Sequence, residues 1–399
     1  MTTERPTMKL PKVPANLRQY GILAALAVIV ILFQVLTNGR LLLPGNINNL
    51  IQQNAYVLIL AVGMVIVIIA GHIDLSVGSV VAMVGAISAI AMTQWGLPWW
   101  AAVIVALLVG ALVGAWQGFW VAFVGIPAFI VTLAGMLLFR GLTLVLLTGG
   151  TINALPGEFN AIGGGWLPAL LGTIGEGRGS RDILTVVIGV VASLALVGVQ
   201  LRARRKQRKL ELITEGSLSF WLKIAIAVVV IVALTWQLSA YRGTPVIFVI
   251  VAILILVYTF VLTRTVFGRH VYAMGGNLFA AQMSGVKTQW VNFFIFVNMG
   301  VLAGLAGIVT TARAGGAVAS AGQSFELDAI AAVFIGGAAV TGGIGTVIGA
   351  VVGALIMGVL NMGLSILAVD PAWQQTIKGL VLLAAVAFDM VNKRRSSLG

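Results

Sequence analysis

Three acidic residues lie beside long apolar stretches, where a charge is unfavourable unless it is paired or faces water. Only eleven of the 399 residues are Asp or Glu, so each one near an apolar segment is informative. Asp74 lies in the run from Gly71 to Gly78 (GHIDLSVG). This run has two interpretations. In the first, Asp74 caps the following helix and Gly71 ends the preceding one. In the second, the run interrupts a helix whose free N–H groups face a hydrophilic substrate.

Glu326 and Asp328 begin another apolar segment, where negative charge complements the dipole of a helix N-terminus. Arg140 and Lys378 lie inside apolar runs, and either can neutralise one of these carboxylates. We therefore expect structural or gating charges at Arg140, Glu326, Asp328 and Lys378. Unpaired polar groups at membrane depth must face water or one another, which predicts a central passage approached by Asp74, Ser76 and Asn361.

The remaining reactive residue types argue against chemistry performed by this chain. Cysteine is absent, and the two histidines, His72 and His270, lie far apart without a second ligand at metal spacing. No nucleophile elbow, metalloprotease helix, paired carboxylates or phosphate-binding loop is present. We expect no metal, no cofactor and no catalytic residue, and any nucleotide must be bound by another subunit. A membrane-embedded transferase would require substrate turnover by the purified chain alone.

A loop between two apolar stretches carries small residues at helical spacing and has basic residues on both sides. Its small and turn-forming members are Gly275, Gly276, Asn277, Ala280, Ala281, Ser284 and Gly285. Small side chains on a short helix let a partner surface approach the backbone closely. We expect a docking helix here, and an ordinary amphipathic turn between spans is the alternative.

The rest of the chain predicts the membrane elements that position these residues. About 60% of the residues are hydrophobic and only 9% are charged, which is typical of polytopic membrane proteins. Long apolar runs include 21–36, 57–70, 101–123, 183–201 and 224–236. They do not alternate as barrel strands do. The expected fold is all-α, a bundle of roughly ten to twelve spans, some of them re-entrant.

The net charge of +13 follows membrane topology and does not indicate nucleic-acid binding. Most Lys and Arg residues fall on one predicted side, so we expect both termini in the cytoplasm and no cleaved signal. The expected organisation is one transmembrane domain, 1–399, with a cytoplasmic tail (1–19), a basic cytoplasmic loop (201–219) and a second cytoplasmic loop (264–289) that contains the expected docking helix. The basic loop meets anionic lipid headgroups or a specific partner. The outer segment 148–181 is a lid, a docking surface or a connector.

Four phrases resemble the monosaccharide (ribose and xylose) permeases of bacterial ABC importers. They are GHIDLSVG at 71–78, FIVTL at 129–133 with Arg140-Gly141, GRHVYA at 268–273 running into Gly275-Gly276-Asn277, and ELDAI at 326–330. Residues 183–240 resemble the extra pair of spans of the longer, xylose-type permeases. The family's coupling loop has the form Glu-Ala-Ala, three residues, Gly. Ala280, Ala281 and Gly285 match it, whereas Phe279 replaces the acidic residue.

This resemblance implies a dimer of two permease copies that receives sugar from a periplasmic binding protein. Two cytoplasmic ATP-binding subunits would drive it. The expected function is import of a monosaccharide, a pentose such as D-xylose, across the bacterial inner membrane. An ion-coupled secondary sugar transporter is the alternative. The sugar itself is not readable from this chain, because selectivity can reside in the binding protein.

Overall fold

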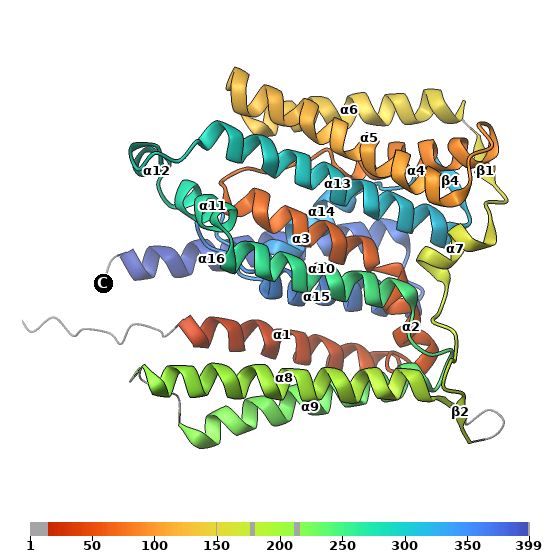
Figure 1. Cartoon of the computed structure of the whole chain (residues 1–399), viewed down its shortest axis with the longest axis vertical. Coiled ribbons are helices and arrows are strands. Elements are labelled where there is room, and N and C mark those ends of the chain that lie inside the picture. The colour runs from red at the N-terminus through yellow and green to blue at the C-terminus, as the bar shows by residue number, and fades with distance from the viewer. Residues whose placement is uncertain (1–14, 149, 176–179, 211–215, 398–399) are drawn as a thin grey trace, which may run out of the picture.

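A computed structural model describes residues 15–148, 150–175, 180–210 and 216–397, and most of them are helical (Figure 1). The first half contains α1 (Ala15–Leu36), α2 (Pro44–Gln53), α3 (Ala55–Ile69), α4 (Val77–Thr93), α5 (Trp99–Phe119), the π-helical turn η1 (Trp120–Val124), α6 (Ala128–Leu147), α7 (Gly157–Gly164) and α8 (Ile183–Lys209). The second half contains α9 (Ser217–Ser239), α10 (Val246–Arg264), α11 (Val266–Gly276), α12 (Leu278–Met283), α13 (Thr288–Ala314), α14 (Phe325–Ile335), α15 (Val347–Ile366) and α16 (Pro371–Ser397).

Within the described residues, strands form two short antiparallel ribbons. β1 (Thr151–Asn153) pairs with β4 (Gly316–Val318), and β2 (Thr173–Ile174) pairs with β3 (Arg181–Asp182). Between β1 and β2, helix α7 packs on α13, where Gly163 lies against the backbone of Val309 and Arg313. The outer segment 148–181 is therefore partly an ordered connector. Residues 149 and 176–179 lie outside the described residues.

The predicted helical membrane bundle is confirmed. Within the described residues, seven helices are long and apolar enough to cross a bilayer: α5 with η1, α6, α8, α9, α10, α13 and α15. Helices α2 and α3 bend by 44° at Asn54, and counting this bent pair as one span raises the number to eight. This count is below ten to twelve because several apolar helices are short or interrupted. Helix α14 has 11 residues, about 16 Å, which is half the thickness of the hydrocarbon.

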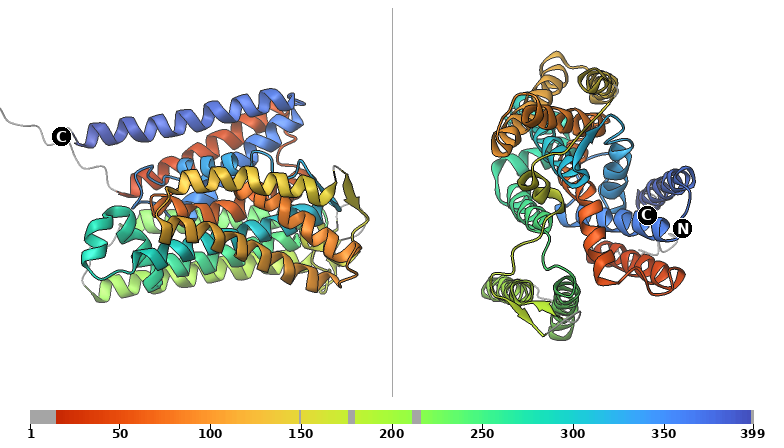
Figure 2. Two further views of the ribbon diagram at one scale, coloured as in Figure 1. Left: turned by 90° about the horizontal axis from the view of Figure 1, so that it is seen from above. Right: turned by 90° about the vertical axis from the view of Figure 1, so that its right-hand side faces the viewer.

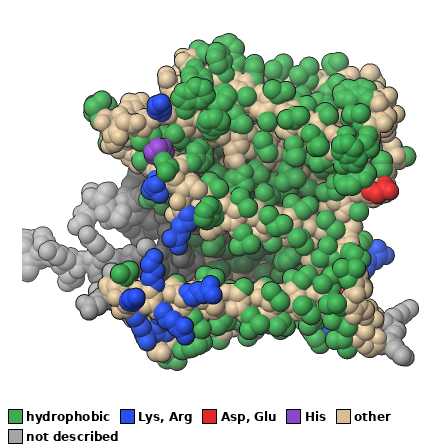
Figure 3. Space-filling view, in the orientation of Figure 1, with side chains coloured by type: hydrophobic (Ala, Val, Ile, Leu, Met, Phe, Trp, Pro, Cys, Tyr) green, Lys and Arg blue, Asp and Glu red, His purple; other side chains and the backbone are tan. Residues whose placement is uncertain are grey.

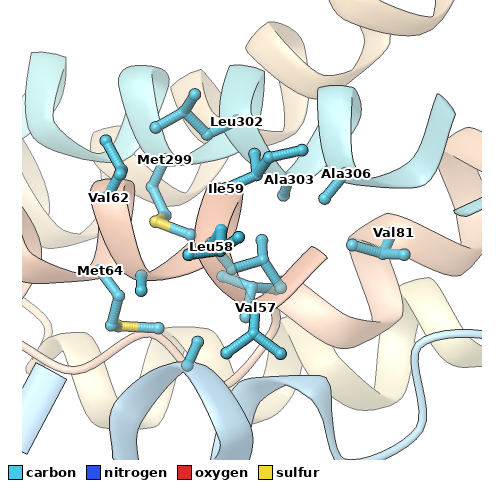
Figure 4. Close-up of a cluster of buried hydrophobic side chains, with 14 of the residues drawn as sticks. Val57, Leu58, Ile59, Val62, Met64, Val81, Met299, Leu302, Ala303 and Ala306 are labelled. Atoms are coloured by element: carbon cyan, nitrogen blue, oxygen red, sulfur yellow. The ribbon is translucent and has the colours of Figure 1, made fainter. Parts of the chain in front are cut away.

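Helix α3 is the centre of the core. It is apolar on every side and almost wholly buried, as expected for a helix surrounded by other helices. Figure 4 shows Val57, Leu58, Ile59, Val62 and Met64 of α3 beside side chains of α13 and α4. The neighbours of α3 include α13, α14 and α15. Polar residues lie at both ends of this packed helix. Asn54 and Tyr56 are at its start, and His72 and Asp74 follow its end.

Gly349 and Gly353, one turn apart on α15, let this helix approach α14 closely. A Cβ atom added at Gly353 would overlap the carbonyl oxygen of Ala332 in α14. A Cβ at Gly349 would overlap the carbonyl oxygen of Gly336. Helices α14 and α15 therefore pack backbone to backbone, the arrangement that small residues permit in membranes.

We expect Gly353→Ala to destabilise the protein by about 1–3 kcal/mol, because neither backbone can move away cheaply. The measurement is the thermal unfolding midpoint in detergent. Gly141→Ala in α6 is the matched control, because a Cβ there meets nothing within 4 Å. It should leave the midpoint unchanged or raise it slightly. Equal midpoints for the two variants would contradict close packing of α14 on α15.

Helices α8 and α9 form a hairpin that lies apart from the main bundle (Figure 2). They correspond to the predicted extra pair of helices. The hairpin meets the rest of the protein where α9 contacts α2. Just after α9, the Arg242 guanidinium lies 4.7 Å from the centroid of the Trp166 ring. Residues 202–209 form the last turns of α8, so this part of the expected basic loop is helical. Residues 211–215 lie outside the described residues.

Lys and Arg side chains gather at the end of the bundle from which α12 projects (Figures 1 and 3). Helix α1 begins and α16 ends at this same end. Residues 1–14, which make up most of the expected tail, lie outside the described residues. We call this end the basic end and the opposite one the far end.

Candidate translocation and coupling sites

The chain breaks sharply between α3 and α4, at the run that contains Asp74. Gly71 has a φ of +86°, which glycine adopts readily, and it ends α3 as predicted. The N–H of Gly71 donates to the carbonyl of Ile68, and that of His72 donates to Val67, the pattern of a Schellman motif. A short non-helical run therefore separates α3, which has 15 residues, from α4, which has 17 residues.

Asp74 is only 2% exposed and is held entirely by hydrogen bonds within the described part of the chain. Its Oδ1 accepts from the backbone N–H of Ser76 at 2.8 Å and from the Ser76 hydroxyl at 2.6 Å. The Nε2 of Gln117 in α5 donates to the same hydroxyl at 2.6 Å. We call Asp74, Ser76 and Gln117 the break cluster. Asp74 thus fixes the turn before α4, and the cluster joins the turn to α5.

We expect Gln117→Leu to lower the free energy of unfolding by about 1–2 kcal/mol, because the Ser76 hydroxyl loses its buried donor. The measurement is again the thermal midpoint in detergent. Gln289→Leu changes an exposed glutamine near the start of α13 and should have little effect. If Gln117→Leu and Gln289→Leu unfold at the same temperature, the break cluster does not stabilise the turn.

A second polar cluster surrounds Asp328 in the first turn of α14. Its Oδ2 accepts from the Tyr56 hydroxyl at 2.7 Å and from the Lys378 ammonium at 3.1 Å. The Tyr56 ring stacks on Phe325, with ring centroids 3.4 Å apart. Lys378 therefore neutralises one of the two α14 carboxylates, as the sequence allows. The ion pair also links α16 to the core of the bundle.

Arg140 bonds backbone carbonyl groups and not a carboxylate. Its Nη1 donates to the carbonyl oxygens of Ala319 at 2.9 Å and Ala321 at 2.7 Å, which holds the irregular stretch between β4 and α14. Glu326 lies against Gly78, where an added Cβ would overlap its Oε2. In the described residues Arg140 does not form an ion pair with Asp328, but its positive charge attracts the Glu326 carboxylate at longer range.

Asn361 lies apart from the break cluster. Its Nδ2 donates at 3.1 Å to Oδ1 of Asn54, the residue at the bend between α2 and α3. The structure thus brings Asp74 and Ser76 together but places Asn361 beside Asn54. Sequence reasoning missed Asn54 and Tyr56. Their signal was available, because both are polar residues that open a long apolar run.

The predicted coupling segment rests on the basic end of α3. A Cβ added at Gly275 would overlap the carbonyl oxygen of Ile69, so Gly275 is an internal packing residue. The Tyr272 hydroxyl donates to the carbonyl of Gly345 at 2.7 Å. Burial raises the pKa of Tyr272 above its ordinary value, which keeps this hydroxyl protonated as a donor. Helix α11 therefore fixes the position of α12.

Helix α12 has a capping residue at its start and a glycine with positive φ after its end. The Oδ1 of Asn277 accepts from the N–H of Ala280 at 2.9 Å, and Gly285, with a φ of +81°, follows the last turn. Gly276, Asn277, Ala280, Ser284 and Gly285 are exposed. Ala281 is not exposed. Only 4% of its surface is accessible, and its carbonyl accepts from Val286, so it faces the protein's own core.

The exposed side of α12 is instead apolar and bulky. Phe279 is 70% exposed and Met283 is 71% exposed. We call these two residues the α12 face. Their exposure at the tip of a projecting helix is typical of a docking surface. Ala281 is therefore not placed to contact a partner, whereas Phe279 and Met283 are accessible.

Comparison with known proteins identifies the family. A profile described as "Branched-chain amino acid transport system / permease component" matches residues 46–386. The chain belongs to this permease family. The matched residues include both polar clusters and α12. No solved structure matches the permease.

Curated relatives are similar over nearly the full length of the permease. The xylose transport system permease protein of Haemophilus influenzae is 41% identical over 380 residues, 95% of this chain and 98% of that protein. Its Escherichia coli K12 counterpart is 40% identical over 381 residues, 96% of this chain and 94% of that protein. The ribose import permease protein of Escherichia coli K12 is 32% identical over 395 residues, 99% of this chain and 100% of that protein. The expected family resemblance is confirmed.

Proposed function

We propose that this chain is the permease subunit of an ATP-driven importer that moves a pentose, D-xylose, into the cell across the bacterial inner membrane. The observation that carries this proposal is the full-length similarity, at 40–41% identity, to two xylose transport permeases. The lower identity to a ribose permease favours xylose over ribose. The family description names branched-chain amino acids, but these relatives match nearly the whole chain and are sugar permeases.

The proposed partners are those that membership of an ABC permease family implies. A cytoplasmic ATP-binding subunit contacts the α12 face at the basic end, which faces the cytoplasm by the positive-inside rule. A periplasmic sugar-binding protein delivers sugar at the far end. Two copies of the chain form the transporter, each as a single permease domain, and the basic turns of α8 meet anionic lipid headgroups. No specific observation favours the ion-coupled alternative.

The substrate is tested by uptake in cells that lack other xylose transporters. Cells expressing the chain with its ATP-binding subunit and binding protein should accumulate radiolabelled D-xylose. Excess unlabelled xylose should compete better than ribose, and leucine should not compete. Omitting the ATP-binding subunit is the control and should abolish accumulation. Competition by leucine but not by xylose would overturn the assignment of a sugar substrate.

A further inference from the structure

A cavity of about 240 Å³ lies between α14, α15 and α16, beside the Asp328–Lys378 ion pair. Its polar lining residues are Ser324, Asp328, Gln375 and Lys378. Its apolar wall is formed by Met357, Leu382 and Leu327, and the cavity opens to the outside of the chain at Leu327, which is 48% exposed. A space of this size is smaller than a typical drug-sized pocket, which suits a small ligand.

The cavity presents hydrogen-bonding groups that the described structure leaves unused. Both donors to Asp328 bond Oδ2, so Oδ1 remains an acceptor on a side chain that is only 2% exposed. The Lys378 ammonium has three N–H donors and uses one. The Gln375 amide and the Ser324 hydroxyl form no side-chain hydrogen bond within the described residues. Donors and acceptors therefore face the same space.

This arrangement selects a class of ligand. Asp328 and Lys378 neutralise one another, so a charged ligand would enter without a counter-charge. A neutral polyol offers hydroxyls that both donate and accept, and its C–H faces fit an apolar wall. The lining thus favours a neutral monosaccharide over an ion.

The backbone around the cavity supports the same conclusion. The stretch 319–324 is irregular, and Ser324 has a φ of +65° before the half-length helix α14 begins. Irregular backbone among membrane helices is tolerated where it is buried in protein or lines a polar cavity. Discontinuous helices form substrate sites in many transporters. The α14 break and the cavity meet at Ser324.

We propose that the cavity between α14, α15 and α16 is a binding site for a neutral polyol, with Asp328, Lys378, Gln375 and Ser324 bonding its hydroxyls. This inference rests on the proposed function for the choice of D-xylose as probe. It adds a position on the sugar's path and the groups that contact the sugar there.

The absence of cysteine allows a direct test. Gln375→Cys introduces the only thiol on the α16 wall, and Leu327→Cys does so on the α14 wall. The complete transporter, in membrane vesicles without ATP, is treated with a thiol-specific reagent with and without D-xylose. Labelling should slow by the factor 1 + [L]/Kd, which is about fivefold when xylose is at four times its Kd. Gluconate, a carboxylate of similar size, should give no protection.

Thr376→Cys is the matched control, because Thr376 follows Gln375 on α16, is exposed and does not line the cavity. Its labelling should not change with xylose. Unchanged labelling at both cavity positions, in a transporter that still takes up xylose, would overturn the cavity site and leave the proposed function standing. Protection of Thr376→Cys equal to that of Gln375→Cys would also overturn it. Loss of xylose uptake by the unmodified transporter would instead contradict the proposed function.

Discussion

The double substitution Phe279→Asp with Met283→Asp is expected to reduce ATP-dependent xylose uptake to background while the permease still folds. Both side chains are at least 70% exposed, so they add little to the core. Buried aromatic and apolar anchors at an interface are commonly worth about 2 kcal/mol each, roughly thirtyfold in affinity. Two new carboxylates should therefore abolish docking. The measurement is copurification of the ATP-binding subunit with the permease, followed by uptake.

Two further variants make this result specific. Gln289→Asp adds a carboxylate to another exposed residue after α12 and should leave copurification normal. Ala281→Trp should instead impair folding, because an indole cannot fit where only 4% of the alanine is accessible. Undiminished copurification of the doubly substituted protein would show that α12 is an ordinary connector.

Lys378→Met is expected to lower the free energy of unfolding substantially. Removing one partner of a buried ion pair costs about 3–5 kcal/mol when both groups are fully buried. The Lys378 side chain is 22% exposed, so solvent screening places the expected loss at the lower end of this range. Asp328 would retain only the hydrogen bond from Tyr56. The thermal midpoint in detergent should fall by several degrees, and α16 should become more sensitive to protease.

A double-mutant cycle separates the ion pair from other effects of these residues. Asp328→Asn with Lys378→Met removes both charges and keeps an oxygen that can accept from Tyr56. This double variant should unfold at a higher temperature than Lys378→Met alone. If the losses from the two single substitutions simply add, the two side chains do not interact, and the link between α14 and α16 is apolar packing.

The sequence located the charged residues but not their partners. Asp328 and Lys378 were recognisable because a charge in an apolar run must be paired or face water. Their pairing depends on α16 lying against α14, an arrangement that local patterns do not encode. Polarity at membrane depth predicts Asn361 beside Asp74, but Asn361 instead bonds Asn54 at the bend between α2 and α3.

For helix α12, the sequence likewise predicts the local structure but not the packing. The cap at Asn277 and the turn at Gly285 follow from side-chain chemistry, so the extent of α12 was predictable. The side that faces outward was not. Helix α12 has six residues, less than two turns, and small and large apolar side chains lie on both sides. Packing of α11 on the end of α3 decides that Ala281 faces inward and Phe279 outward.

Reconstitution into liposomes tests most directly whether this permease is driven by a separate ATP-binding subunit. The permease, that subunit and the sugar-loaded binding protein are combined with ATP on the side of the α12 face. Xylose should accumulate only when ATP is present, and dissipating proton and sodium gradients should not change the rate. Accumulation by the permease alone, under an ion gradient and without ATP, would contradict the account and identify a secondary transporter.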